Sequence, residues 1–443
     1  MAASMPPIHR MAPVQIEDEQ RDQVRQTASP RISPRLKTTI FILWNVVAIA
    51  AVFAVLELGM RAVQHRRLGP GAYETEALRD RFTGWRNNPA FSRADIHINR
   101  QGFRHEQDVP VAKPPDTVRI FLVGGSAAFG AEGLYPEIDN RHSRLYGNQL
   151  IDYYLEQKLN QTFPGKHWEV INAGVSEYRL YQDLALTESA LLQYRPDYIL
   201  LLDGHNDIAG LAVAPANYDV YASTGHLEEF NQLANPRSVH AAVFFMYTWL
   251  RSNSALFRFL SDHLQFRTMR ANRMHSASKE RQFTSPVKFS DLTPEEQAQF
   301  TSSHNQISLY LREARQIHRI LDLDGVKTVF LLQPELILTH KPLTDSERRM
   351  ADYHRKVSGP LTVYSYEQFD PEISGIMSSA ATRDGFRFLD LTDVFDHTPG
   401  QTFSDSCHLT AEGNRVIAER VFQFLGDSFA ETARTGAILP RHD

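Results

Sequence analysis

The sequence predicts an α/β fold in which helices cover both faces of a parallel sheet. Three observations predict it: short apolar runs at intervals, helical periodicity between most of them, and small or polar residues where the runs end. Buried parallel strands are continuous apolar runs joined by crossover helices, so we expect a sheet of about five strands. The expected strands are residues 119–123, 169–172, 198–202, 327–332 and 387–391.

Apolar residues at helical spacing occupy three of the intervals between these runs. They are Ile151, Tyr154, Leu155 and Leu159, then Leu180, Leu184, Leu191 and Leu192, then Ile317, Ile320 and Leu321 before Asp324-Gly325. Each set shares one helix face, and we expect these faces to pack against the sheet.

Composition narrows the class of protein. A chain of 443 residues that is 42% hydrophobic can bury a large core. The net charge of −5 offers no basic field for phosphates, so no nucleic-acid partner is expected. The single cysteine, Cys407, excludes an intramolecular disulfide and a cysteine-based zinc cluster.

The N-terminal part predicts a membrane anchor. Residues 1–37 are rich in Pro, Arg, Gln and Ser and read as a disordered tail. Residues 40–56 are apolar and uncharged, which places a transmembrane signal anchor at 38–60. A cleaved signal peptide is the alternative, but the preceding region is long and no small-x-small cleavage site follows the run.

Positive charges on either side of the run predict its orientation. Lysine and arginine are slightly more numerous before the run than after it, which favours a cytoplasmic N-terminus and an extracytoplasmic (periplasmic or extracellular) domain. The charges counted are Arg25, Arg31, Arg35 and Lys37 against Arg61, Arg66 and Arg67.

The rest of the chain divides into three further segments, the second of which carries an insertion. Residues 61–117 read as a stalk leading into the domain, 118–430 as the α/β domain, and 431–443 as a C-terminal tail. The strand-helix alternation breaks at about 211–305, where apolar residues at helical spacing and a basic stretch indicate a helical insertion. This insertion is a subdomain with a solvated basic face or a lid that meets a membrane surface or an acidic polymer.

Residues that suit nucleophilic catalysis follow several of the expected strands. Ser126 comes after Gly124-Gly125 at the end of the first run, where a strand turns into a helix. His408 follows Asp405 by three residues, a spacing at which the carboxylate can orient the imidazole as a base. Taken alone, Asp405 is also a typical helix N-cap, and a lone histidine is commonly structural.

Two further positions could donate hydrogen bonds to an oxyanion. Gly174 in I-N-A-G-V offers a backbone N–H, and Asn206 in D-G-H-N-D offers a side-chain amide, although an Asn there is commonly a turn residue. These sites all follow strand ends, and the carboxyl ends of parallel strands share one rim. We therefore expect Ser126, Gly174, Asn206 and His408 to lie together.

These four residues stand in the order and local contexts of the four blocks of the SGNH or GDSL hydrolases, and the chain resembles that family over roughly residues 118–427. Gly204-His205-Asn206-Asp207 resembles its G-x-N-D block and Asp405-Ser406-Cys407-His408 its D-x-x-H block. The resemblance implies a flavodoxin-like three-layer α/β/α sandwich and a Ser126-His408-Asp405 triad without cofactor or metal. It also implies an oxyanion hole made by the N–H groups of Ser126 and Gly174 and the side chain of Asn206.

One position departs from the family pattern. The first block usually reads G-D-S, and here Gly125 stands in place of the Asp. Cys407 is a weak candidate nucleophile, because a neighbour in sequence cannot easily face His408.

The sequence thus predicts a serine esterase acting on a small-molecule, lipid or glycan ester, with its domain tethered to a membrane. Acyl transfer to an envelope or exported polysaccharide uses the same triad and stays open. A non-catalytic, membrane-tethered binding or scaffold protein is the alternative of another class.

Overall fold

The computed structural model describes residues 33–68, 77–131 apart from 81, 90 and 94, then 133, 135, 138, 145–213, scattered positions between 242 and 261, and 286–435. The chain divides into two compact units between Met60 and Arg61. The expected tail at 1–37 lies almost wholly outside the described residues.

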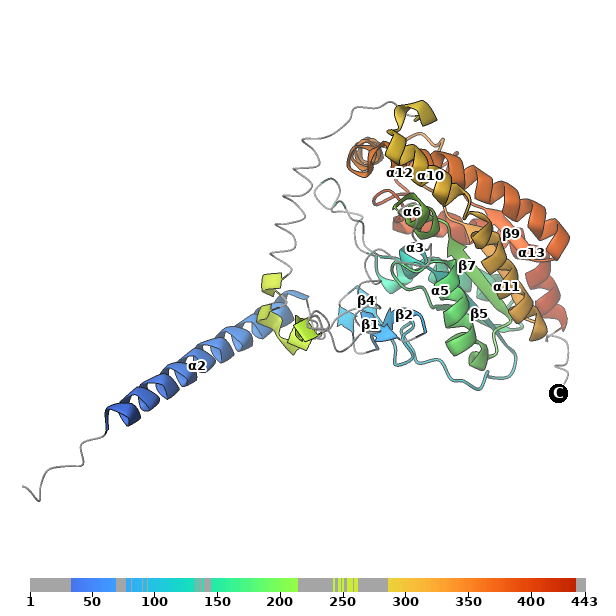
Figure 1. Cartoon of the computed structure of the whole chain (residues 1–443). Coiled ribbons are helices and arrows are strands. Elements are labelled where there is room, and N and C mark those ends of the chain that lie inside the picture. Colours follow the sequence, from blue (N-terminus) through green and yellow to red (C-terminus); the bar gives the residue numbers. More distant parts are fainter. Residues whose placement is uncertain are drawn as a thin grey trace, which may run out of the picture. The chain divides into compact units, whose positions relative to one another are not determined.

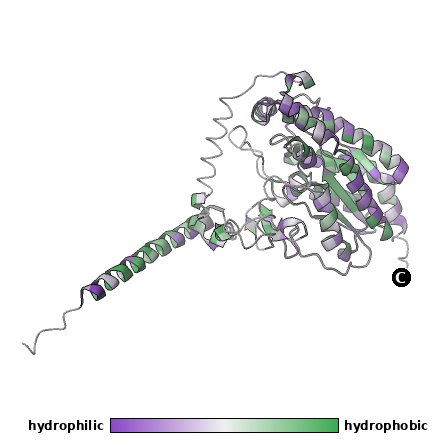
Figure 2. Cartoon of the chain, viewed as in Figure 1, coloured by the Kyte–Doolittle hydropathy of each residue, from purple (hydrophilic) through white to green (hydrophobic). Residues whose placement is uncertain are grey.

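The N-terminal unit contains most of a long apolar helix, α2 (Pro34–Leu68). Figures 1 and 2 show this helix, which is hydrophobic over most of its length. Its stretch Pro34–Val63 is long and apolar enough to cross a membrane, a test that a signal sequence also passes. The expected span at 38–60 lies inside it.

The second unit is built around a five-stranded parallel sheet with the order β6-β5-β7-β8-β9. All five expected strands are confirmed, with ends that differ by two residues at most. Their bounds are β5 (Thr117–Gly124), β6 (His167–Asn172), β7 (Tyr198–Asp203), β8 (Lys327–Leu332) and β9 (Arg387–Asp390).

Helices cover both faces of the sheet, giving the expected three-layer sandwich (Figure 1). On one face α4 (Ile151–Thr162) packs against α13 (Ala411–Thr435), and Phe429 of α13 contacts Tyr198. Ile199 follows Tyr198 in β7, so its side chain points to the opposite face of the sheet. Phe121 pairs with Ile199 and therefore points to that second face as well. There it contacts Tyr194, in the short helix Leu192–Tyr194 that follows α5 (Leu180–Leu186) and the π turn Thr187–Leu191.

On that second face α5 packs against α11 (Ser308–Leu323), which also contacts α12 (Asp345–Asp384). The long α12 is kinked at Gly359, where the backbone is not helical. Since α13 ends at Thr435, residues 431–435 belong to a helix instead of the expected tail.

The strand order fixes where a site can form. Numbered along the chain, the sheet has the order 2-1-3-4-5, which is that of flavodoxin-like folds. The crevice beyond the carboxyl ends of the first and third strands, β5 and β7, is the usual ligand site of such a sheet. Ser126 follows β5 and Asn206 follows β7.

Part of the segment expected as a stalk belongs to the packed domain. β1 (Ala77–Asp80) pairs with β2 (Gly84–Asn87), and β3 (Ser92–Arg93) pairs with β4 (Ile96–His97), both antiparallel. Phe103 and Val109 lie in the main hydrophobic core. The stalk interpretation missed this because the apolar positions between 85 and 109 follow neither strand nor helix periodicity.

The expected insertion at 211–305 is described only in part. α6 (His205–Val213) runs into its start, and α10 (Pro294–His304) forms its end after the short η4 (Phe289–Asp291). α10 begins at a capping box between Thr293 and Glu296 and packs against α6 and α12. Most of the basic stretch lies outside the described residues.

Candidate active site

The turn after β5 positions Ser126 as the first residue of the short helix α3 (Ser126–Phe129). At Gly124 the backbone has φ +139°, and a Cβ there would lie 2.2 Å from the carbonyl oxygen of Leu202. Only glycine fits that turn. Ser126 itself is partly exposed, whereas the next three residues are buried.

The loop that carries His408 is shaped by the side chain of Asp405. One oxygen, Oδ1, accepts hydrogen bonds from the backbone N–H groups of Cys407 at 2.9 Å and His408 at 2.7 Å. The loop is closed by the N–H of Ser404, which donates to the carbonyl of His408. This self-contained turn explains why the D-x-x-H spacing holds the two side chains together.

His408 connects Asp405 to Ser126. Its Nδ1 lies 2.6 Å from Asp405 Oδ2, and its Nε2 lies 2.8 Å from Ser126 Oγ. Asp405 is fully buried, which by itself would raise the pKa of its carboxyl, but His408 and two backbone N–H groups lower that pKa below its usual range. An ionised Asp405 places the imidazole proton on Nδ1, so Nε2 can accept from the serine hydroxyl.

A buried ion pair anchors this loop to the start of α12. Lys341 Nζ lies 2.8 and 2.7 Å from the two carboxylate oxygens of Glu347, and both side chains are inaccessible to solvent. Glu347 Oε1 also accepts from the N–H groups of Thr402 at 2.9 Å and Phe403 at 3.2 Å. The pair therefore fixes the backbone just before Asp405.

Gly174 lies near the site, but its N–H is engaged. The group donates to Asn172 Oδ1 at 3.1 Å, so an oxyanion would have to share or replace this acceptor, and the expected role of Gly174 as an oxyanion donor stays a prediction. A Cβ at Gly174 would lie 2.4 Å from the backbone nitrogen of Phe129. The structure thus explains this glycine by close packing against α3.

Asn206 lies against the nucleophile turn. Its Nδ2 donates to the carbonyl of Tyr178 at 2.8 Å, which leaves the second amide hydrogen for another acceptor. A Cβ at Gly125 would lie only 2.5 Å from this Nδ2. The side-chain amide of Asn206 can therefore occupy this position because residue 125 has no side chain.

A buried polar group lies next to the site, and two of its members, Glu335 and Tyr366, were not predicted from the sequence. His205 Nδ1 lies 2.7 Å from Glu335 Oε1 and 3.0 Å from the hydroxyl of Tyr366. Burial raises the pKa of Glu335. Burial alone would lower the pKa of His205, but the carboxylates of Glu335, Asp405 and Asp207 together raise it above its usual value. The N–H of Leu336 donates to the carbonyl of Ser406, so this group also supports the His408 loop. Gln333 and Glu335 follow the end of β8, and this position after a strand end is the sequence signal that could have identified them as site residues.

The β2 strand supplies a second support that sequence reasoning missed. Trp85 Nε1 donates to the carbonyl of Ser176 at 3.0 Å, and the hydroxyl of Tyr178 donates to the carbonyl of Trp85. Asn87 Nδ2 donates to the carbonyl of Gly174 at 2.9 Å. These bonds hold the loop that carries the Asn206 acceptor.

Within the described residues, one set of three His, Cys, Asp or Glu side chains converges as metal ligands would: Asp405, Cys407 and His408, with ligand atoms within 4.8 Å. Asp405 and His408 already bond each other, and Cys407 is a buried thiol whose pKa burial raises well above its usual range. The group is arranged as an acid-base pair, and a protonated Cys407 is a poor nucleophile.

Comparison with known proteins gives distant structural likeness only. No family model matches the chain, and no curated protein matches it. Among solved structures, the acetyl xylan esterase AlAXEase is similar at 10% identity, over 69% of this chain and 98% of that chain, with a TM-score of 0.35. A putative lipolytic protein of the G-D-S-L family from Desulfitobacterium hafniense DCB-2 is similar at 11% identity, over 70% and 99%, with a TM-score of 0.33. LAE5, an alpha/beta hydrolase from the metagenome of Lake Arreo, is similar at 16% identity, over 70% and 95%, with a TM-score of 0.30.

Proposed function

We propose that the protein is a serine esterase that hydrolyses a carboxylic ester, with an acetyl or other small acyl group as the first substrate class to test. The observation that carries the proposal is the continuous chain from Ser126 Oγ through His408 to Asp405, with contacts of 2.8 and 2.6 Å. Its position after β5, at the switch point of the sheet, supports a substrate site there.

In the proposed reaction, Ser126 Oγ attacks the ester carbonyl as its proton passes to His408 Nε2. The imidazolium formed is stabilised by the ionised Asp405, whose lowered pKa keeps it charged at neutral pH. Protonation of the departing alcohol by His408 leaves an acyl-enzyme. Water, deprotonated by His408, then releases the carboxylic acid and restores Ser126.

The tetrahedral intermediate carries a negative oxygen that needs donors. The N–H of Ser126 and the second amide hydrogen of Asn206 are the proposed donors, and each donor of this kind contributes about 10²–10³ in turnover. Gly174 is left out of this set because its N–H is bonded to Asn172.

The test is covalent labelling with a fluorophosphonate probe, followed by hydrolysis of p-nitrophenyl acetate. We expect labelling of the wild type at Ser126 and a loss of both labelling and turnover in Ser126→Ala. Ser379→Ala is the matched control, because Ser379 is an exposed helical serine whose hydroxyl donates to the carbonyl of Gly375 in the same helix. Wild-type protein that is unlabelled, or a Ser126→Ala variant with unchanged turnover, would refute the proposal.

The proposal places α2 in a membrane as an uncleaved anchor, with the second unit outside the cytoplasm. The length and apolar character of Pro34–Val63 support it. A reporter that is active only outside the cytoplasm, fused after the last residue, tests the orientation. An inactive reporter on a stable, full-length fusion contradicts it.

A further inference from the structure

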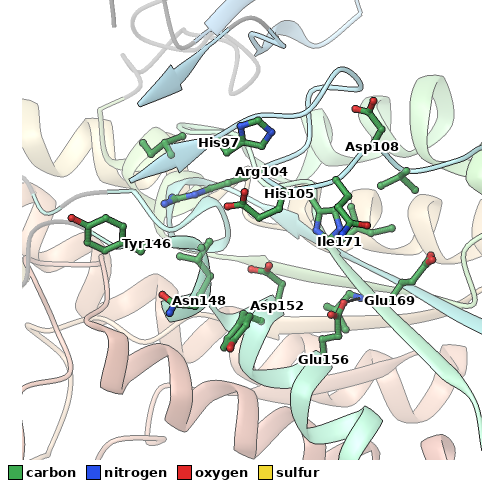
Figure 3. Close-up of a pocket in the computed structure, with 18 of the residues that line it drawn as sticks. His97, Arg104, His105, Asp108, Tyr146, Asn148, Asp152, Glu156, Glu169 and Ile171 are labelled. Carbon is green, nitrogen blue, oxygen red and sulfur yellow. Dashed lines mark hydrogen bonds between the residues drawn. The ribbon is translucent and has the colours of Figure 1, made fainter. Parts of the chain in front are cut away.

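A cavity of about 890 Å³ lies at the β6 edge of the sheet, and neither Ser126 nor His408 lines it. Its walls come from residues 93–110, from the short helix η1 (Gly147–Gln149) with the start of α4, and from β6. Figure 3 shows side chains from these three segments around one hollow. The volume lies within the range of roughly 300–1,000 Å³ that is usual for clefts that hold a small ligand.

The two arginines of the cavity wall, Arg93 and Arg104, form hydrogen bonds with other groups of the protein. Arg93 is paired with Asp95 by two contacts of 2.7 Å. Arg104 is only 4% exposed and donates to four backbone carbonyls, those of Asp95, Phe129, Gly130 and Leu145. No lysine is among the described residues that line the cavity, so its wall does not suit an anion.

Carboxyl groups are part of the rest of the wall, beside apolar residues and histidines. Asp152 is 6% exposed and accepts from Asn172 Nδ2 on Oδ1, and Glu156 accepts from the N–H of Val170 on Oε2. In these hydrogen bonds each carboxyl group uses one of its two oxygens. Glu106 and Asn148 add further exposed polar groups. A ligand rich in hydrogen-bond donors fits such a wall.

The acceptors are spread around the cavity. Among the described residues, the one group that converges as metal ligands is Asp405, Cys407 and His408, which lies outside this wall. An extended molecule therefore suits the cavity better than a single cation. Tyr146, which is 51% exposed, and Tyr153 add aromatic surfaces with polar tips.

We propose that this cavity binds a neutral oligosaccharide segment, whose hydroxyls donate to Asp152, Glu156 and Glu106 and whose sugar faces lie on Tyr146 and Tyr153. The inference concerns binding alone and does not depend on the proposed esterase activity.

The charge state of the buried wall agrees with a neutral ligand. Burial raises the pKa of Asp152 to about 7, and burial also lowers the pKa of the half-buried His105. At neutral pH the His105 imidazole is therefore largely uncharged, and about half of the Asp152 carboxyl groups keep their proton, so both groups can donate as well as accept hydrogen bonds. Sugar hydroxyls also donate and accept, whereas an ammonium group only donates.

The cavity wall is also bonded to the nucleophile helix. Asn172 Nδ2 donates to both Asp152 Oδ1 and the carbonyl of Ala128 in α3. Arg104, which lines the cavity, donates to the carbonyls of Phe129 and Gly130, at the end of the same helix. A glycan held in the cavity would thus contact residues that are hydrogen-bonded to α3, the helix that carries Ser126.

The experiment uses the purified full chain on an array of neutral glycans, followed by calorimetric titration with the best binding oligosaccharide and with spermidine. We expect saturable binding of a neutral glycan and weaker binding of spermidine. The double variant Tyr146→Ala/Asn148→Ala should weaken glycan binding at least tenfold, since both residues are exposed in the wall. Phe82→Ala is the matched control, because Phe82 is an exposed aromatic residue that does not line the cavity.

Three outcomes would overturn the inference: no neutral glycan binds, glycan binding is unchanged in the double variant, or spermidine binds more tightly. The Ser126→Ala protein should bind the glycan like the wild type. This variant separates the two proposals, because it removes the expected nucleophile and leaves the cavity wall intact.

Discussion

The side-chain amide of Asn206 occupies the space that any side chain at Gly125 would need: a Cβ built there lies 2.5 Å from Nδ2 and 3.1 Å from the carbonyl of Tyr178. The backbone at Gly125 has φ −76°, which every residue type can adopt, so the restriction comes from these neighbours. The departure from the G-D-S pattern thus has a local physical reason. Residue 125 and Asn206 form one packed unit.

Replacing Gly125 should therefore impair catalysis through Asn206. We expect Gly125→Ala and Gly125→Asp each to push the amide away from the turn and to lower kcat for p-nitrophenyl acetate by about 10- to 100-fold, because one oxyanion donor is displaced. Gly165→Ala is the matched control, since a Cβ there meets nothing within 4 Å. A kcat of Gly125→Asp equal to that of the wild type would show that catalysis does not require the Asn206 amide to lie against residue 125.

The Lys341–Glu347 pair should contribute strongly to stability. Removal of one partner leaves a buried charge, so Lys341→Met is expected to lower the free energy of unfolding by about 3–5 kcal/mol. Denaturant unfolding of the purified chain measures this change. Arg415→Met tests the opposite case, because the Arg415–Glu412 pair is about half exposed and such pairs contribute about 0–1 kcal/mol. Similar losses in both variants would contradict the structural role given to Glu347.

The positions of the strands along the chain were predictable, because a buried strand leaves a continuous apolar run in the sequence. Residues 198–202 and 327–332 are continuous apolar runs, and the structure contains both as central strands. The positions of Ser126, Asp405 and His408 at one rim also followed from strand ends and from the three-residue spacing. Local sequence is enough for these features because each depends on neighbours along the chain.

The supports of the site depend on long-range contacts and left no such pattern. Trp85 lies 91 positions before its acceptor Ser176, and His205 lies 130 positions before Glu335. Gly174 was predicted as an oxyanion donor because, in the sequence, a glycine at a strand end suits that role as well as it suits close packing. Its bond to Asn172 and its contact with Phe129 are visible only in three dimensions.

Trp85 should act as a positioning residue for the loop near Asn206. Trp85→Phe keeps an aromatic ring but removes the Nε1–H that donates to Ser176. We expect kcat for p-nitrophenyl acetate to fall several-fold while KM changes little, because the loop carbonyl that orients Asn206 becomes less fixed. Trp168→Phe removes a buried indole N–H that has no hydrogen-bond partner in the described part of the chain, so it controls for the loss of ring size. An equal fall in kcat in both variants would refute the positioning role.

Asp152 should make stability depend on pH between about 4 and 7. Burial raises the pKa of this carboxyl from 3.8 to about 7, so in this range the folded protein holds a proton that the unfolded chain releases. The stabilisation is complete below the unfolded pKa and is lost as pH rises through 7. Asp152→Asn cannot release that proton. Relative to the wild type, the variant should therefore gain on the order of 2–4 kcal/mol of unfolding free energy between pH 4 and pH 8.

Denaturant unfolding at several pH values measures the difference. Asp116→Asn is the control, because Asp116 lies at the surface beside Lys166, whose hydrogen bond and charge lower the pKa of that carboxyl. The Asp116 variant should parallel the wild type from pH 5 to pH 8, since that aspartate is ionised in both the folded and the unfolded state throughout. If the Asp152→Asn curve also runs parallel to the wild type, Asp152 is ionised in the folded protein and does not retain the extra proton.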